Sequence, residues 1–254
     1  MNIQQKKLAV FDFDGTLNES KVPIDAEMGE LLVKLLEKKF VAIISGSGFD
    51  YFKLNILDHF HASPEINKKL FLFPTSSTRF YRFEDNVWNQ IYADELTLEE
   101  RKKIKDAFEK AYKDIDYQHP PQLFGEVVED RGTQVTFSAL GQQAPLDLKR
   151  EWREKHDRRP ELVKALEKYL PEFEVKMPGV TSIDVTRKGI DKAYGIRQMR
   201  DHLGIAINEM IFVGDALYEG GNDYAVKAAG VDCIEVSGPV DTKKVIREWL
   251  EELV

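Results

Sequence analysis

Cysteine is almost absent from this chain of 254 residues, in which Cys233 is the only one. A single cysteine cannot form an intramolecular disulfide, and a chain without disulfides is typical of a reducing compartment. The sequence also lacks an apolar run long enough to span a bilayer, and its first residues do not form an apolar segment of signal-peptide length. We therefore expect a cytoplasmic protein.

Positive charge is also in deficit, because 36 Lys and Arg residues stand against 44 Asp and Glu residues and give a net charge of −8. A nucleic-acid partner is unfavoured, since such proteins need a basic surface to displace counterions. The basic segment 149–159 is a local exception, either a solvated helix face or an anion-binding element. With 43% hydrophobic residues and no low-complexity tract, the chain is expected to be globular.

The first part of the chain alternates strand and helix patterns. Short continuous apolar runs at Leu8–Phe11, Phe40–Ile44 and Leu70–Phe73 are typical of strands buried on both faces. An amphipathic helix is expected over Asp25–Lys39, between the first two strands. Strand, helix and strand in this order predict an α/β fold with a parallel, Rossmann-like sheet.

The middle of the chain has a different pattern, with strand-like segments at 80–92 and 125–140 in which polar residues alternate. A capping box at 97–100 opens one helix, and another helix is expected from 160 to 170. The α/β alternation returns afterwards, with a helix over 191–203 and strands at 210–213 and 231–236. We predict a discontinuous core domain of residues 1–85 and 188–254, with an α+β domain of residues 86–187 inserted into it.

Chemically active side chains follow the predicted core strands at the points where these end. Asp12 and Asp14 come after the first strand, in the motif Asp-x-Asp-Gly-Thr, and Ser45 follows the second. Asp215 follows the strand at 210–213, and Lys192 lies at a predicted helix start, where the helix dipole favours an anion. Because the carboxyl ends of parallel strands meet at one edge of a sheet, we expect a ligand site there. Carboxylates placed together favour a hard cation such as Mg²⁺.

These elements, in this order, resemble the haloacid dehalogenase (HAD) superfamily. The resemblance implies that Asp12 attacks phosphorus and forms an aspartyl-phosphate, while Asp14 protonates the leaving oxygen. It implies that Ser45 and Lys192 hold the oxygens of the transferring phosphoryl group. Magnesium would be held by Asp12, by the backbone carbonyl of Asp14 and by the acidic motif. The expected ligands from that motif are Asp215, Asn222 and Asp223.

Within the superfamily, the sequence resembles the cap-bearing IIB type, and most closely the phosphomannomutases of eukaryotic kind. The resemblance rests on the long acidic motif 214–223, on the segments 182–185 and 189–192, and on 129–131 running through 138–141. It implies a substrate site on the inserted domain, called the cap in this family. The residues expected there are Arg131, Ser182 and Asp184, which match family residues that bind the sugar phosphate. Hexose 1,6-bisphosphate as an activator and a homodimer formed through the cap are further expectations.

The sequence departs from the family pattern at several phosphate-binding positions. Gln142 stands where the family has an arginine, and an arginine of the nucleophile loop falls near Lys21. Another family arginine falls at Lys149 or at Arg150, and we take Arg150 as the candidate. Lysine does not replace arginine where a phosphate is bound by two parallel hydrogen bonds. In addition, the segment 74–78 replaces a Glu-Asn-Gly stretch of the family.

Three functions therefore remain open from the sequence. The leading prediction is a hexose-phosphate mutase that interconverts mannose 1-phosphate and mannose 6-phosphate. The second is a sugar-phosphate phosphatase, in which water accepts the phosphoryl group. The third is a catalytically silent binding or dimerisation module, which would require the loss of Asp12, Asp14 or Asp215, and all three are present.

Overall fold

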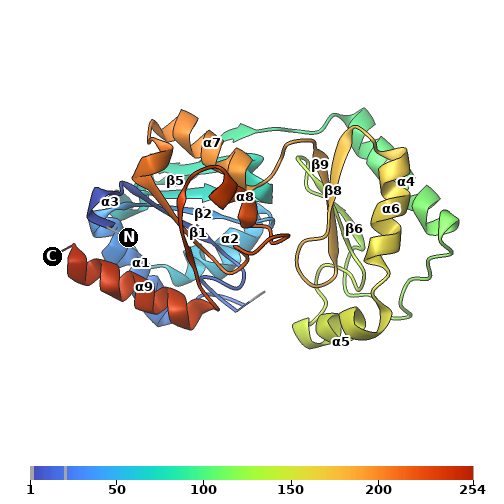
Figure 1. Cartoon of the computed structure of the whole chain (residues 1–254), viewed down its shortest axis with the longest axis horizontal. Helices are drawn as coiled ribbons and strands as arrows, with labels where there is room; N and C mark the ends of the chain where they lie inside the picture. Colours follow the sequence, from blue (N-terminus) through green and yellow to red (C-terminus); the bar gives the residue numbers. More distant parts are fainter. Residues whose placement is uncertain (1–2, 20–21, 254) are drawn as a thin grey trace. The chain divides into compact units, whose positions relative to one another are not determined.

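The computed structural model describes residues 3–19 and 22–253, and the chain forms two compact units (Figure 1). Unit 1 comprises Met1–Ala93 and Asp191–Val254, and unit 2 comprises Asp94–Ile190. No helix within the described ranges is long and apolar enough to cross a membrane.

Unit 1 is built on a seven-stranded sheet with the strand order β11-β10-β1-β2-β3-β4-β5. The first five strands in this order are parallel, and β4 and β5 add an antiparallel hairpin at the edge. The predicted α/β class and parallel sheet are therefore confirmed. The strands are β1 (Leu8–Asp12), β2 (Phe40–Ile44), β3 (Leu70–Phe73), β4 (Arg79–Glu84), β5 (Val87–Ala93), β10 (Met210–Gly214) and β11 (Asp232–Glu235).

Helices cover both faces of this sheet because its central strands are apolar on both sides. Ala9 and Phe11 of β1 pack with α1 (Ala26–Lys38), α2 (Phe49–Asn55) and α9 (Pro239–Glu252) on one face. Leu8 and Val10 point the other way and pack with α7 (Lys192–Leu203) and α8 (Tyr224–Ala228). A further short helix is α3 (Pro64–Asn67). The result is a three-layer α/β domain (Figure 1).

Unit 2 is a four-stranded antiparallel sheet with the order β6-β7-β9-β8. One face packs on α4 (Leu98–Asp114) and α6 (Arg159–Tyr169), and α4 begins at the predicted capping box of Thr97 and Glu100. The other elements are β6 (Val128–Asp130), β7 (Val135–Ser138), α5 (Leu146–His156), β8 (Phe173–Lys176) and β9 (Ser182–Arg187). Alternate residues of β7 and β9, such as Thr136 and Asp184, point to the opposite, polar face.

The two compact units divide at residues other than the predicted 86 and 187. β5 pairs with β4 over its whole length, from Val87 opposite Glu84 to Ala93 opposite Arg79. The whole hairpin therefore belongs to unit 1, and unit 2 begins at Asp94. Its end also lies beyond the predicted residue 187, at Ile190, whose carbonyl accepts a 2.7 Å hydrogen bond from Lys176 Nζ of β8. The hairpin alternates polar and apolar residues because it is the antiparallel edge of the large sheet.

Candidate active site in unit 1

The carboxyl ends of β10, β1 and β2 lie side by side and carry three of the predicted residues. Asp12 is the last residue of β1, opposite Ile44, and Ser45 follows directly in the chain. Asp215 follows Gly214, the last residue of β10, which pairs in parallel with β1. The parallel pairing therefore brings together residues that are far apart in the sequence.

The turn after β1 approaches Asp215 closely, and Gly15 makes this approach feasible. Gly15 has a φ of +90°, a conformation that side chains rarely adopt. A Cβ atom at this position would lie 2.5 Å from Asp215 Oδ2. The Asp-x-Asp-Gly motif thus requires glycine for both backbone conformation and space.

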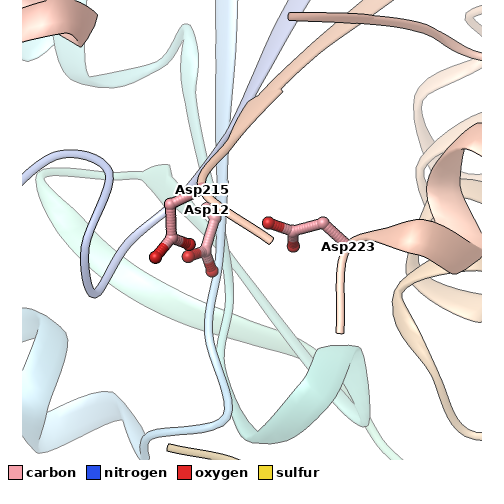
Figure 2. A group of neighbouring side chains, drawn as sticks. All are labelled: Asp12, Asp215 and Asp223. Carbon is pink, nitrogen blue, oxygen red and sulfur yellow. The ribbon is translucent and has the colours of Figure 1, made fainter. Parts of the chain in front are cut away.

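Asp12, Asp215 and Asp223 form an acidic cluster at this edge of the sheet (Figure 2). One carboxylate oxygen from each lies within 4.8 Å of the others. Burial raises the pKa of Asp12, and the carboxylates of Asp223 and Asp215 raise it further, while Lys192 opposes them. Burial and then Asp223 also raise the pKa of Asp215. Such a set of oxygen donors is stabilised by a cation, and it can hold a metal ion.

Lys192 supplies a positive charge to this cluster. It is the first residue of α7 and is 7% exposed. Its Nζ atom donates to Asp12 Oδ1 at 2.6 Å and also to Asp223 Oδ1. Burial lowers the pKa of Lys192, but Asp12 and Asp223 more than offset this, so its pKa is raised and the ammonium stays protonated.

Asp223 is fully buried and has both carboxylate oxygens engaged. Oδ1 accepts from Lys192, and Oδ2 accepts from the backbone N–H of Ala216 at 3.0 Å. Gly214 provides the room, since a Cβ there would lie 2.3 Å from Asp223 Oδ2. Asn222, also predicted as a metal ligand, lies in the same loop with an exposed side chain.

The remaining predicted residues of unit 1 are Asp14, Ser45 and Lys21. Asp14 is half-buried, and its Oδ1 atom accepts a hydrogen bond of 2.7 Å from the hydroxyl of Tyr51, a residue that the sequence did not single out. Ser45 is buried, and its Oγ accepts from the backbone N–H of Ser47 at 3.1 Å. Lys21 lies outside the described residues.

In unit 2, Arg131, Gln142 and Lys149 form a contiguous polar group. One Arg131 nitrogen donates to Gln142 Oε1 at 3.2 Å, and Lys149 Nζ donates to the Gln142 carbonyl at 3.1 Å. Arg131 also forms an ion pair with Glu129, at 2.6 Å. Lys149 is buried, whereas Arg150, the predicted partner of the phosphate, is exposed on α5.

Ser182 and Asp184 lie two residues apart on β9 and therefore on the same face of the sheet of unit 2. Asp184 is buried, and its Oδ1 accepts from the Thr136 hydroxyl at 2.8 Å. Thr136 in turn accepts from Gln134 Nε2 at 2.9 Å. The buried residues Gln134 and Thr136 were not predicted, because the contact between Thr136 and Asp184 joins residues 48 positions apart in the sequence.

Comparisons with known proteins extend these observations. A family model described as eukaryotic phosphomannomutase matches residues 28–252. The phosphomannomutase of Encephalitozoon cuniculi is 27% identical over 261 residues, covering 98% of this chain and 95% of that protein. The phosphomannomutase of Saccharomyces cerevisiae is 26% identical over 254 residues, covering 95% of this chain and 93% of that protein.

Two solved structures share the fold. A Plasmodium falciparum IMP-nucleotidase superposes with a TM-score of 0.72 at 15% identity, over 99% of this chain and 70% of its own. An Aspergillus fumigatus trehalose-6-phosphate phosphatase superposes with a TM-score of 0.58 at 17% identity, over 98% of this chain and 96% of its own. At such identities the likeness concerns the fold alone.

Proposed function

The chain belongs to the eukaryotic phosphomannomutase family, and from this premise we propose that it transfers a phosphoryl group between positions 1 and 6 of a hexose. The observation that carries the proposal is the arrangement of Asp12 at a strand end, beside Asp215 and in contact with buried Lys192. A carboxylate held there by a lysine and open to a metal ion is a competent nucleophile toward phosphorus.

The reaction then has two half-steps. An oxygen of Asp12 bonds to phosphorus as the bond from phosphorus to the sugar oxygen breaks. The departing sugar oxygen takes a proton from Asp14. In the second half-step Asp14 removes the proton of the accepting hydroxyl, whose oxygen bonds to phosphorus as the aspartyl-phosphate bond breaks. Ser45 and Lys192 stabilise the charge on the transferring oxygens. Asp223 keeps Lys192 in place.

Magnesium fits the donor set, because the clustered side chains offer only carboxylate oxygens. Asp12, Asp215 and the Asp14 backbone carbonyl would hold the ion, with Asn222 and Asp223 in the adjoining loop. When bound, Mg²⁺ reduces the repulsion between the carboxylate and the incoming phosphate.

Activity is expected to disappear in EDTA and to return with Mg²⁺, whereas Ca²⁺ should support it poorly. Calcium prefers more ligands at longer distances, which would hold the nucleophile and the phosphate too loosely for reaction. Turnover of an aryl phosphate in metal-free buffer, then with each ion added back, tests this. Full activity in metal-free buffer would contradict it.

Two phosphate sites are needed by a mutase, one at Asp12 and one for the phosphate that is not reacting. We propose Arg131 and Lys149 as cations of the second site, with Ser182 and Asp184 binding the sugar. Lys149 replaces Arg150 in this assignment because Lys149 is the residue bonded to Gln142. Hexose 1,6-bisphosphate is the proposed activator, since it carries a phosphate for each site.

One observation favours a phosphatase side reaction. Gln142 stands where the family has an arginine, and this neutral residue accepts a hydrogen bond from Arg131. Losing a charged, hydrogen-bonding phosphate ligand typically costs about 1.5–3 kcal/mol, or roughly a tenfold to hundredfold loss of affinity. A bisphosphate that leaves too early exposes the aspartyl-phosphate to water. We therefore expect measurable mutase activity accompanied by hydrolysis.

Substituting Gln142→Arg should shift the ratio of transfer to hydrolysis toward transfer. The new guanidinium adds a positive charge beside Arg131, and a bound phosphate relieves the repulsion between the two. The ratio is measured as hexose 6-phosphate formed against inorganic phosphate released. Gln143→Arg is the matched control, because it adds the same charge at the neighbouring, exposed residue. If the wild type only hydrolyses hexose phosphates and Gln142→Arg does not change this, the phosphatase assignment is correct instead.

A further inference from the structure

Tyr51 connects two of the strand-end segments that form the candidate active site. It lies in the first turn of α2, which begins shortly after Ser45 at the end of β2. Its hydroxyl donates to Oδ1 of Asp14, in the segment after β1, at 2.7 Å. The bond therefore joins the serine loop to the residue proposed to transfer the proton.

Ring packing and backbone hydrogen bonds hold Tyr51 in place. Its ring packs against Phe13 with 5.3 Å between ring centroids, and Phe13 is fully buried between the two aspartates of the motif. The Tyr51 carbonyl accepts from Asn55 Nδ2 at 2.9 Å, and the Asn55 carbonyl accepts from the N–H of Ile24 at 2.9 Å. The position of the hydroxyl is thus fixed by packing and by the backbone of α2.

We propose that Tyr51 is a positioning residue for Asp14, an inference that rests on the proposed function. A carboxyl group rotates easily about its last side-chain bond, and a general acid must present its proton in a defined direction. The Tyr51 hydroxyl fixes this rotation by donating to Oδ1. Because the hydroxyl continues to donate to Oδ1 when the carboxyl is protonated, the transferred proton is carried by Oδ2.

The proton transfer then proceeds from Oδ2 of Asp14 to the leaving oxygen, while the Asp12–phosphorus bond forms and the phosphorus–oxygen bond of the substrate breaks. In the return step Oδ2 takes the proton of the attacking hydroxyl. The orientation matters most for a sugar or phenol of high pKa, since such a leaving group departs only with a proton. A dinitrophenolate leaves without one and does not require Asp14 to be aligned.

The test compares Tyr51→Phe with the wild type on a series of phosphate esters with Mg²⁺. For hexose 1-phosphate and phenyl phosphate, kcat/KM should fall on the order of tenfold, a part of the full contribution of a general acid. For dinitrophenyl phosphate it should change by less than about twofold. In an Asp14→Asn background, Tyr51→Phe should cause no further loss, because the two residues act as one unit.

Tyr81→Phe is the matched control, since it removes a hydroxyl that donates to Gln90 at 2.7 Å elsewhere in the same unit. It should leave the whole series unchanged, and both variants should unfold at nearly the wild-type temperature. Equal losses on all esters, or no loss on phenyl phosphate, would overturn the role of Tyr51. A wild-type protein without Mg²⁺-dependent turnover of any ester would overturn the proposed function instead, before any variant is compared.

Discussion

Replacing Asp12 by asparagine is expected to lower turnover by several orders of magnitude while the protein stays folded. The amide has the shape of the carboxylate, but it lacks the charge that attacks phosphorus and binds the metal ion. Folding should survive because Lys192 keeps its bond to Asp223, and because one of three neighbouring carboxylates loses its repulsive charge. Steady-state turnover with Mg²⁺ measures the loss of activity, and the unfolding temperature in metal-free buffer measures the effect on folding.

Asp58→Asn is a suitable control for this experiment, since Asp58 is an exposed residue of the same unit. It should retain full activity. An Asp12→Asn protein that keeps a tenth of the wild-type activity with Mg²⁺ present would show that another residue is the nucleophile.

Replacing Lys192 by methionine should remove activity and also weaken the fold. The substitution keeps most of the length of the side chain but leaves the buried carboxylates of Asp12 and Asp223 without their shared cation. Removing one partner of a buried ion pair typically costs about 3–5 kcal/mol, because the remaining charge is unpaired. The free energy of unfolding in urea, measured without metal, should fall by an amount of this order.

Mg²⁺ should recover part of the lost stability of Lys192→Met, since it offers the carboxylates another cation. Lys34→Met, at an exposed position on α1, is the matched control and should leave activity and stability unchanged. Wild-type turnover or unchanged stability of Lys192→Met would contradict the assigned role of this lysine.

The core fold was predictable because its strands are continuous apolar runs. Leu8–Phe11 and Val41–Ile44 are buried on both faces, which is the pattern of parallel strands covered by helices. The grouping of Asp12, Ser45 and Asp215 also followed, since parallel strands end at one edge. The predicted boundary at residue 86 divided the hairpin of β4 and β5, because antiparallel edge strands of a large sheet have the same alternation as those of a small one.

The supporting contacts of the site could not be predicted, because they depend on tertiary structure. Thr75, Ser76 and Ser77 have φ angles of 50°, 56° and 67°, although none is glycine. The backbone N–H groups of Thr75 and Ser76 donate to the carbonyls of Ser47 and Ser45, which supports this costly conformation from the neighbouring loop. Such a turn has no local sequence signal. The segment 74–78 was recognised only as a departure from the family.

The same turn explains why α7 carries a glycine in its first turns. A Cβ atom at Gly195 would lie 2.3 Å from Ser77 Oγ and 2.7 Å from Ile44 Cδ1. The helix that begins with Lys192 therefore packs directly on the ends of β2 and of the segment after β3. From local propensity alone, a glycine within a helix is expected to destabilise the helix. Only the close packing against Ser77 and Ile44 explains why glycine is needed at this position.

The central claim is most directly tested by the products formed from mannose 1-phosphate with Mg²⁺ and a trace of hexose 1,6-bisphosphate. Mannose 6-phosphate and inorganic phosphate are measured in the same reaction over time. We predict that mannose 6-phosphate forms and depends on the bisphosphate, accompanied by some release of inorganic phosphate. Formation of mannose and inorganic phosphate alone, with or without the bisphosphate, would contradict a mutase.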